Sequence, residues 1–347
     1  MIDSIQELKP KLSRRQASQL LSRQVIPKNA EKGLIKGNLV KAQPTTTDRT
    51  AITVSQQYRW HRLVDSVYKD LWERNTGVCP VTSRSFGELM PHFLIGLDES
   101  SICADHAGNL KIIGAANKKK HEKILQDSRL SITMVRTGTV AGTTGPTIIL
   151  LKGVTKQKAY SDDFLVKHGL APGSTIIMTE SAYMTNEAWL KATPYLMKGY
   201  RQLPYIKDNP NWFIVEFLDG FVSHESVFEA NKLRAEKKCL SVKEEAATSH
   251  SNQAYDQLVA KNDKHIACDT LTLQRTMLKL NGLNRKQLTQ YHLVHTVLQV
   301  VTATTQDMWV QSFVRVNLDP RVRLPFQEWI VKIQTYLAAG QTIINEE

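Results

Sequence analysis

The amino-acid sequence predicts an α/β fold in which a mixed β-sheet is flanked by helices, with further helical regions at both ends of the chain. Two observations favour this fold. Between residues 91 and 262, short apolar segments rich in Ile, Leu and Val alternate with segments of helical character. Hydrophobic residues make up 41% of the 347 residues, which is enough for a sizeable core and excludes a wholly disordered chain.

The expected sheet is formed by apolar segments in which β-branched residues are frequent, because such side chains pack well on a pleated surface. Gly138, Gly142, Gly145 and Pro146 indicate a turn between two of these strands. The predicted strands are Phe93–Leu97, Leu110–Ile113, Ser131–Val135, Thr147–Leu151, Ser174–Met178, Trp212–Leu218 and Cys239–Val242. The predicted helices are one that begins at Thr185, then Ser223–Lys238 and Ser251–Asn262.

Residues 1–75 form a basic helical region, with 14 Lys and Arg residues against 7 Asp and Glu residues. Its first predicted helix runs from a cap at Ser13 to Arg23, and a polar linker follows at residues 41–50. A second helix is predicted over Ser55–Arg74, because its apolar residues recur on one helical face. We expect this apolar stripe to pack on a neighbouring domain. Its members are Trp60, Val64, Val67, Tyr68 and Leu71.

The other end of the chain, residues 267–347, is predicted to be mainly helical, with breaks at Pro320 and Pro325. Its longest apolar run, Leu293–Val301, is interrupted by polar residues and is shorter than the ~20 residues that cross a bilayer. No membrane partner is therefore expected. The net charge of +12 favours a polyanionic partner through counterion release, although the basic residues can also serve solubility alone.

Two of the predicted strands lead directly into an aspartate: FLIGL into Asp98 and WFIVEFL into Asp219. Sites of α/β sheets lie at the carboxyl ends of strands, although a strand followed by an aspartate is also an ordinary turn. A third aspartate, Asp256, lies in the last predicted helix of the sheet region. Three such carboxylates can hold two Mg²⁺ ions about 3.5–4 Å apart for phosphodiester chemistry. Glu99 is not expected to be a ligand, because adjacent residues of a strand face opposite ways.

Three short segments carry a resemblance to a known family. LDES (97–100), LDGFVSHES (218–226) and SHSNQAYDQLVAKNDK (249–264) resemble the three blocks of the DDE-superfamily endonuclease domain of pogo and Tigger-like transposases. The separations of 121 and 37 residues between the aspartates fit the family's long first gap and short second gap. Two flanking segments, residues 176–190 and 311–329, extend the resemblance over about residues 90–330.

This resemblance implies an RNase H-like endonuclease domain at residues 90–266, followed by the helical region at 267–347. It implies a DNA endonuclease and strand transferase in which Asp98, Asp219 and Asp256 bind Mg²⁺, with Mn²⁺ as a substitute. It also implies double-stranded DNA as partner, a homodimer on DNA, a nuclear location, and residues 1–75 as a remnant of a helix-turn-helix region. The chain departs from the family pattern at Ser100, Phe221, Ala254 and Tyr255. The alternative is therefore a domesticated, non-cutting DNA-binding protein.

Other polar residues are weaker candidates. Basic side chains of the N-terminal region and of one connection between strands are candidates for DNA phosphate contacts, with solvated surface as the alternative. Two histidines are expected either to line the cleft or hydrogen-bond the aspartates, or simply to hold their loops. The glycine-rich stretch 138–145 lacks the Gly-Lys-Ser/Thr ending of a P-loop, which excludes that nucleotide site. The basic candidates are Arg14, Arg15, Arg23, Lys118, Lys119 and Lys120, and the histidines are His224 and His250.

Overall fold

The computed structural model describes eight parts of the chain. The chain divides into two compact units, Met1–Thr46 and Thr47–Glu347, and every described residue belongs to the second. The predicted helix from Ser13 to Arg23, the linker at 41–50 and the predicted strand Leu110–Ile113 lie outside the described residues. The described ranges are 52–77, 88–104, 130–155, 160–219, 227–244, 252–281, 288–337 and 343–344.

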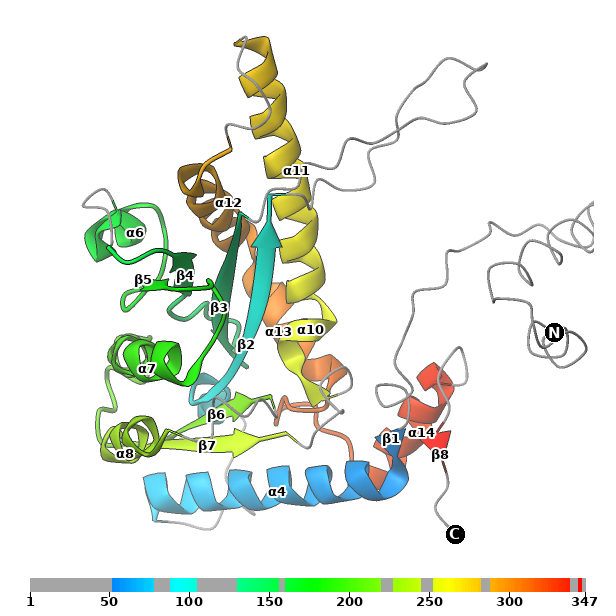
Figure 1. Ribbon diagram of the computed structural model, residues 1–347. Helices are drawn as coiled ribbons and strands as arrows, with labels where there is room; N and C mark the ends of the chain where they lie inside the picture. The colour runs from blue at the N-terminus through cyan, green and yellow to red at the C-terminus, as the bar shows by residue number, and fades with distance from the viewer. Residues whose placement is uncertain are drawn as a thin grey trace, which may run out of the picture. The chain divides into compact units, whose positions relative to one another are not determined.

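A six-stranded mixed sheet forms the centre of the second unit, with strand order β5-β4-β3-β2-β6-β7 (Figure 1). β3 is antiparallel to both of its neighbours, whereas β2, β6 and β7 run parallel, as do β4 and β5. This is the mixed sheet that the sequence predicts. A separate two-residue pairing joins β1 and β8. The strands are β1 (Ile52–Thr53), β2 (Leu94–Cys103), β3 (Ser131–Thr139), β4 (Ile148–Lys152), β5 (Thr175–Thr179), β6 (Ile214–Leu218), β7 (Cys239–Lys243) and β8 (Ile343–Ile344).

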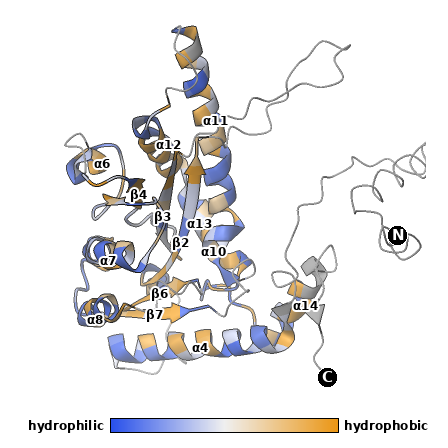
Figure 2. Cartoon of the chain, in the orientation of Figure 1, coloured by the Kyte–Doolittle hydropathy of each residue, from blue (hydrophilic) through white to orange (hydrophobic). Residues whose placement is uncertain are grey.

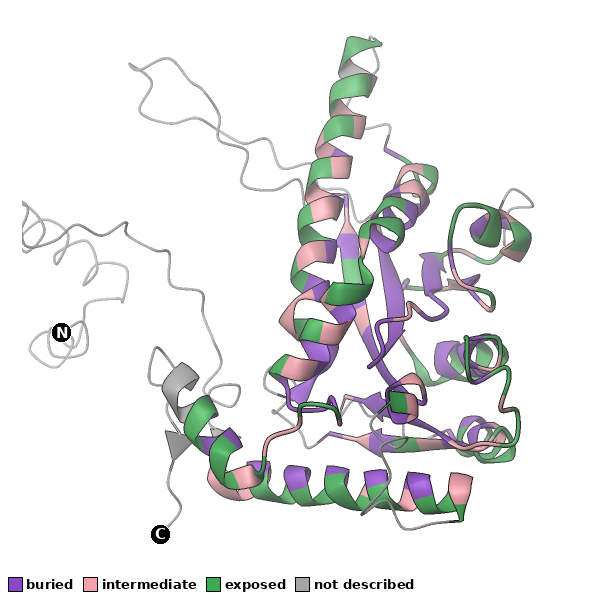
Figure 3. Ribbon diagram, turned by 180° about the vertical axis from the view of Figure 1, so that it is seen from behind, coloured by how far each residue is buried: buried purple, intermediate pink, exposed green. Residues whose placement is uncertain are grey.

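Helices cover both faces of the sheet, so that the strands are buried and the helices expose their outer sides (Figure 3). The α-helices are α4 (Val54–Thr76), α6 (Asp162–Lys167), α7 (Asn186–Tyr200), α8 (Phe228–Glu236), α10 (Ala254–Gln257), α11 (Val259–Leu280), α12 (Gln290–Ala303), α13 (Gln306–Arg315) and α14 (Phe326–Leu337). A short 3-10 helix, η3 (Met90–His92), precedes β2. Among these described helices, none is both long and apolar enough to cross a membrane.

The hydrophobic core has two clusters because successive side chains of a strand point to opposite faces. Ile148 and Leu150 of β4 belong to one cluster, which also contains residues of α4, α7 and α13. Ile149 and Leu151 belong to the other, with residues of α6, α11 and α12. Figure 2 shows the strands as mainly hydrophobic, whereas the helices carry both hydrophilic and hydrophobic residues. A sheet buried on both faces explains why its strands read as continuous apolar runs.

Helix α4 confirms the predicted helix at 55–74 and extends it slightly, to Val54–Thr76. Thr53 and Gln56 form a capping box at its start, and Gly77 ends it in a left-handed conformation with φ 70°. Four members of the apolar stripe are buried as predicted, and Val67 is partly buried. Two of its members, Trp60 and Tyr68, pack edge-on against Phe217 of β6. α4 is thus an integral part of the sheet unit.

Helix α11 is longer than the helix predicted at 251–262. It begins at Val259 and continues without a break to Leu280, across the boundary that the sequence predicts between residues 266 and 267. The residues before it form the separate short helix α10. Side chains of α11 such as Leu271 share one hydrophobic cluster with the strands and with α12, so the helical C-terminal region packs directly on the sheet.

Two glycines allow α13 to approach the centre of the sheet. Gly96 of β2 lies opposite Gly138 of β3 in the antiparallel register. A Cβ atom at Gly96 would lie 2.8 Å from the ring of Phe313, and one at Gly138 would lie 2.3 Å from Trp309. Both distances are too short for carbon atoms, so the absence of side chains here makes room for the two aromatic rings. The prediction that Gly138 belongs to a turn is wrong, because Gly138 lies within β3. A glycine is needed there because the ring of Trp309 packs closely against it.

Candidate metal centre

The sequence predicted that Asp98 directly follows a strand, but Asp98 lies inside β2. β2 continues to Cys103 because it stays paired with the long strand β3, whereas the short strand β6 pairs only with its first residues, Leu94–Gly96. On the β6 side, Asp98 therefore lies just beyond the paired part of β2. Its side chain is almost fully buried, with 7% of its surface exposed.

Asp98 and Asp219 lie at one level of the sheet. Gly96 is opposite Phe217 in the parallel register of β2 and β6, and the two aspartates follow these residues at the same distance along their strands. Paired residues of neighbouring parallel strands point to the same side of the sheet, and the strands are about 4.8 Å apart. The register therefore brings the two carboxylates together, as predicted from their places at the ends of apolar runs.

The carboxylates of Asp98, Glu99 and Asp219 form one group, with ligand oxygens that all lie within 4.8 Å of one another. Glu99 was not expected to be a ligand, but its carboxylate lies with those of Asp98 and Asp219. Alternation along a strand fixes the direction of the Cβ atom, but the longer glutamate side chain can bend back toward a neighbouring carboxylate. Glu99 also fixes its neighbour, because its backbone N–H donates to Oδ1 of Asp98 at 2.7 Å.

Asp256 approaches the same group from the helical side. It lies exposed in α10, whose start is attached to β2 by the side chain of Gln253, which donates to the carbonyl of Leu97 at 3.4 Å. The negative charge of Asp256 raises the pKa of Asp98, so the two carboxyl groups interact. Among the described residues, the group within 4.8 Å does not include Asp256. Its role as third metal ligand stays a prediction.

Burial and like charge act together on Asp98. Loss of water raises the pKa of its carboxyl well above the ordinary value, and the charges of Glu99, Asp256 and Asp219 raise the pKa further, against the lowering effect of the Glu99 N–H bond. Several carboxylates held this closely repel one another when ionised. A divalent cation between them would remove the repulsion.

The donor set fits a hard dication. Carboxylate oxygens are the ligands that Mg²⁺ and Mn²⁺ prefer, and the group contains no sulfur or imidazole ligand among the described residues. Three carboxylates with oxygens within 4.8 Å of one another need only a small inward shift to surround one Mg²⁺ ion at a metal-to-oxygen distance of about 2.0–2.1 Å. Asp98, Glu99 and Asp219 are therefore the residues that could hold a magnesium or manganese ion.

Sequence reasoning missed a further carboxylate, Glu244. It directly follows β7 and is 2% exposed. Burial raises the pKa of its carboxyl well above the ordinary value, and Asp98, Asp219 and Asp256 raise the pKa further by their charges. The signal was present in the sequence: a carboxylate after a third apolar strand, in the same place as Asp219 after β6.

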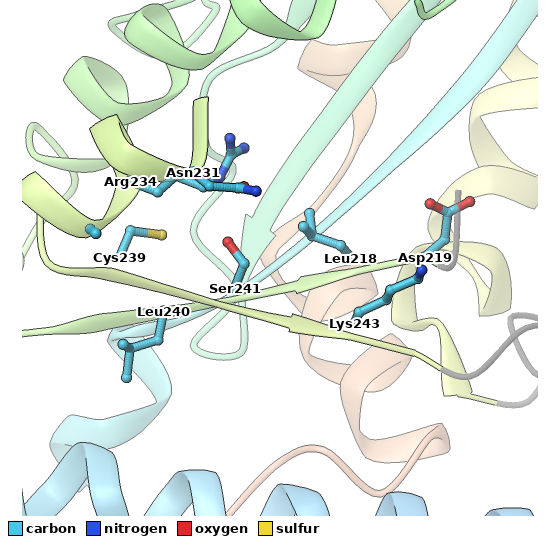
Figure 4. Close-up of a pocket in the computed structure, with 9 residues that line it drawn as sticks. Leu218, Asp219, Asn231, Arg234, Cys239, Leu240, Ser241 and Lys243 are labelled. Carbon is cyan, nitrogen blue, oxygen red and sulfur yellow. The ribbon is translucent and has the colours of Figure 1, made fainter. Parts of the chain in front are cut away.

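A cavity of about 370 Å³ opens beside Asp219, between α8, the end of β6 and the length of β7 (Figure 4). Asp219 and Lys243 lie at one end of it, whereas Asn231 and Arg234 reach it from α8. The cavity thus places Asp219 of the acidic group in the same lining as an amide and two basic side chains. Its lining residues are Leu218, Asp219, Asn231, Arg234, Ala235, Cys239, Leu240, Ser241 and Lys243.

The remaining site predictions lie outside the described residues, and they stay predictions. They comprise the two histidines proposed to assist the aspartates and the basic side chains proposed to contact DNA. These residues are His224, His250, Arg14, Arg15, Arg23, Lys118, Lys119 and Lys120.

Comparison with known proteins finds likeness only at the level of structure. No family model matches the sequence, and no curated protein matches it. The Mos1 transposase paired-end complex with left transposon end matches with a TM-score of 0.50 and 10% identity, over 95% of this chain and 77% of that chain. A pre-cleavage Mos1 transpososome matches with a TM-score of 0.49 and 11% identity, over the same shares of the two chains.

At 10% identity, the first of these matches bears on the fold alone, but it extends over 95% of the chain. It agrees with the mixed sheet of six strands and with the helices at both ends of the described unit. The chain therefore has an RNase H-like, transposase-like fold, with an acidic group at the edge of its central parallel strands.

Proposed function

We propose that this protein is a DNA transposase-like enzyme of the pogo or Tigger type, which cuts transposon ends and joins them to target DNA. The observation that supports it most is the group of Asp98, Glu99 and Asp219 within 4.8 Å on an RNase H-like sheet. The matching Mos1 transposase is seen in complex with a transposon end, which supports the same class of reaction. We further propose that the substrate is double-stranded DNA, that two chains act on it as a homodimer, and that the protein works in the nucleus.

Both reactions are displacements at phosphorus. In cutting, the oxygen of a water molecule attacks a backbone phosphorus, the bond from phosphorus to the 3′ oxygen breaks, and that oxygen takes up a proton as a 3′-hydroxyl. In joining, this hydroxyl loses its proton to solvent, its oxygen attacks a phosphorus of the target, and the corresponding bond of the target breaks. One set of groups can serve both reactions, because the bonds that form and break are of the same kind.

The residues of this chain have distinct tasks in the proposal. Asp98, Asp219 and Asp256 would hold Mg²⁺ or Mn²⁺, with Glu99 beside them. Divalent ions held in this way supply a Lewis acid that stabilises charge on the attacking and leaving oxygens. Asp98 is well suited to its task, because pairing with β3 fixes its backbone and its side chain is almost fully buried.

The second candidate is a domesticated protein that binds DNA without cutting it. The specific observation in its favour is that Asp256 is exposed and stands outside the group of carboxylates within 4.8 Å, among the described residues. If Asp256 is not held in position with the other carboxylates, the site would bind two metal ions weakly.

A plasmid-nicking assay distinguishes the two candidates. The full chain is incubated with supercoiled plasmid that carries a transposon end, with Mg²⁺, with Mn²⁺ and with a chelator. We expect nicked circles with either ion and none with the chelator. A full chain that binds this DNA and leaves it intact with both ions would contradict the enzyme and support the non-cutting protein.

The basic N-terminal segment offers a test of DNA binding. Deletion of residues 1–51 removes 10 Lys and Arg residues, including Arg14, Arg15 and Arg23, and 4 Asp and Glu residues. If those three arginines contact phosphates, the slope of log affinity against log salt should become shallower by roughly 2 to 3. The measurement is fluorescence anisotropy of a labelled duplex at several salt concentrations.

The deletion must end before α4, because Trp60, Val64 and Tyr68 are buried in the core and removal of residues 1–75 would expose that core. A matched control replaces Lys207 and Lys237, two exposed lysines of the sheet unit, with Gln. An unchanged slope after the deletion would mean that the segment is solvated surface and not a phosphate contact.

A further inference from the structure

The position of Glu244 is defined by strand pairing. Leu218 of β6 lies opposite Lys243 of β7 in the parallel register. The pairing continues for one more residue, since the backbone N–H of Glu244 donates to the carbonyl of Leu218 at 3.0 Å. Asp219 and Glu244 are therefore neighbours at the ends of parallel strands, and their side chains point to the same side of the sheet.

Three neighbouring strands thus present a carboxylate at one level. β2 contributes Asp98, β6 contributes Asp219 and β7 contributes Glu244, in the order in which the strands lie in the sheet. At about 4.8 Å for each strand, the two outer residues of this row are separated by about 10 Å. Such a row is long enough for two ions about 3.5–4 Å apart.

Glu244 has the features of a metal ligand. It is 2% exposed, and its Oε2 atom is completely buried without a hydrogen-bond partner in the described part of the chain. A buried carboxylate oxygen in this state is unfavourable, and native proteins rarely keep one without a reason. The nearby ionisable groups that act on it, Asp98, Asp219 and Asp256, are all acidic, so they increase the cost.

Another glutamate of the same sheet shows what a structural role requires. Glu216 of β6 is 0% exposed, but it accepts hydrogen bonds from Tyr200 at 2.6 Å and from Arg234 at 2.8 Å. Its charge is therefore balanced within the protein. Glu244 is similarly buried, but its Oε2 has no hydrogen-bond partner among the described residues, and the charges that act on it are negative.

We infer that Glu244 is a further carboxylate of the metal centre and binds a divalent cation beside Asp219. The inference rests on the proposed metal-dependent function, and it assigns to that function a ligand from β7 in addition to the three aspartates. Glu244 would add a ligand next to Asp219, the member of the acidic group that also lines the cavity under α8.

Calorimetric titration of Mn²⁺ into the full chain tests the assignment. We expect Glu244→Gln to bind Mn²⁺ roughly 10-fold or more weakly than the wild type, since the amide keeps the shape of the side chain but loses its charge. Thermal unfolding, measured without and with Mn²⁺, gives a second readout, and the substitution should act in opposite directions on the stability of the metal-free chain and on the stabilisation by Mn²⁺. Without metal, Glu244→Gln should melt at a higher temperature than the wild type, because repulsion is relieved, and it should gain less stability when Mn²⁺ is added.

The matched control is Glu229→Gln, which makes the same change in charge at an exposed position of α8 and should leave Mn²⁺ affinity unchanged. Equal Mn²⁺ affinity of Glu244→Gln and the wild type would overturn the inference and leave the proposed function standing. No Mn²⁺ binding by the wild type would overturn both. If Glu244→Gln does not fold, as judged by circular dichroism, Glu244→Asp decides: a shortened ligand weakens binding, whereas wild-type affinity of this variant would overturn the inference.

Discussion

Asp219→Asn is expected to abolish nicking of supercoiled DNA by Mg²⁺ or Mn²⁺, with a loss of roughly 100-fold or more in rate, and to leave DNA binding intact or slightly stronger. The carboxylate of Asp219 is one of three whose oxygens lie within 4.8 Å. The amide that replaces it has the same shape, but it binds a hard dication poorly. A loss of several kcal/mol in stabilisation of the transition state corresponds to this change in rate.

DNA binding should survive because phosphates are contacted mainly by Lys and Arg, and removal of one negative charge relieves repulsion within the acidic group. Nicking is followed on agarose gels and binding by mobility shift. Asp208→Asn, the same substitution at an exposed position outside the site, is the matched control and should nick as the wild type does. Normal nicking by Asp219→Asn would exclude Asp219 as a ligand and remove the main support for the proposed enzyme.

The largest effect on stability is expected for Glu216→Ala. Arg234 is 2% exposed and lies 4.2 Å above the ring of Trp189, and its guanidinium donates to Glu216 at 2.8 Å and to Thr193 at 2.9 Å. Removal of the glutamate leaves the buried Arg234 without its carboxylate partner and the buried Tyr200 hydroxyl without its acceptor. Loss of one partner of a buried pair costs about 3–5 kcal/mol in the free energy of unfolding, which urea denaturation measures.

Two controls separate the buried pair from a general effect of charge. Glu187→Ala removes the partner of Lys191 on the surface of α7 and should leave the urea midpoint unchanged, because solvent screens an exposed pair. The double substitution Glu216→Leu with Arg234→Met removes both charges and should recover much of the stability lost by the single substitution. A single variant as stable as the wild type would show that the pair contributes little.

Much of the fold was predictable because its strands are short, apolar and separated by clear breaks. The runs at 93–97 and 212–218 were recognised as strands, and the aspartates that follow them, Asp98 and Asp219, do meet in the structure. Helix α4 was predicted to within two residues at each end, because its apolar residues follow the helical period closely.

The features that were missed depend on contacts between distant segments. The extension of β2 to Cys103 results from pairing with β3 and leaves no apolar pattern in the polar residues Asp98–Ser101. The length of α11 depends on packing against α12, and the contribution of Glu99 depends on the bend of one side chain. Glu244 could be assigned to the group only after the register of β6 and β7 was known.

The pairing of β2 with β6 also affects how the chain folds. Asp98 and Asp219 are 121 residues apart in the sequence, whereas β6 and β7 are separated by a much shorter segment. Long-range pairing carries the larger cost in chain entropy and sets the folding rate more than local pairing does.

The carboxylates come together only when this pairing is complete. An ion that binds them would recognise the folded chain and not its intermediates, and at 100 times its dissociation constant it would stabilise the native state by about 2.7 kcal/mol. The concentration of divalent ions would then govern how much of the protein is folded as well as how fast it acts.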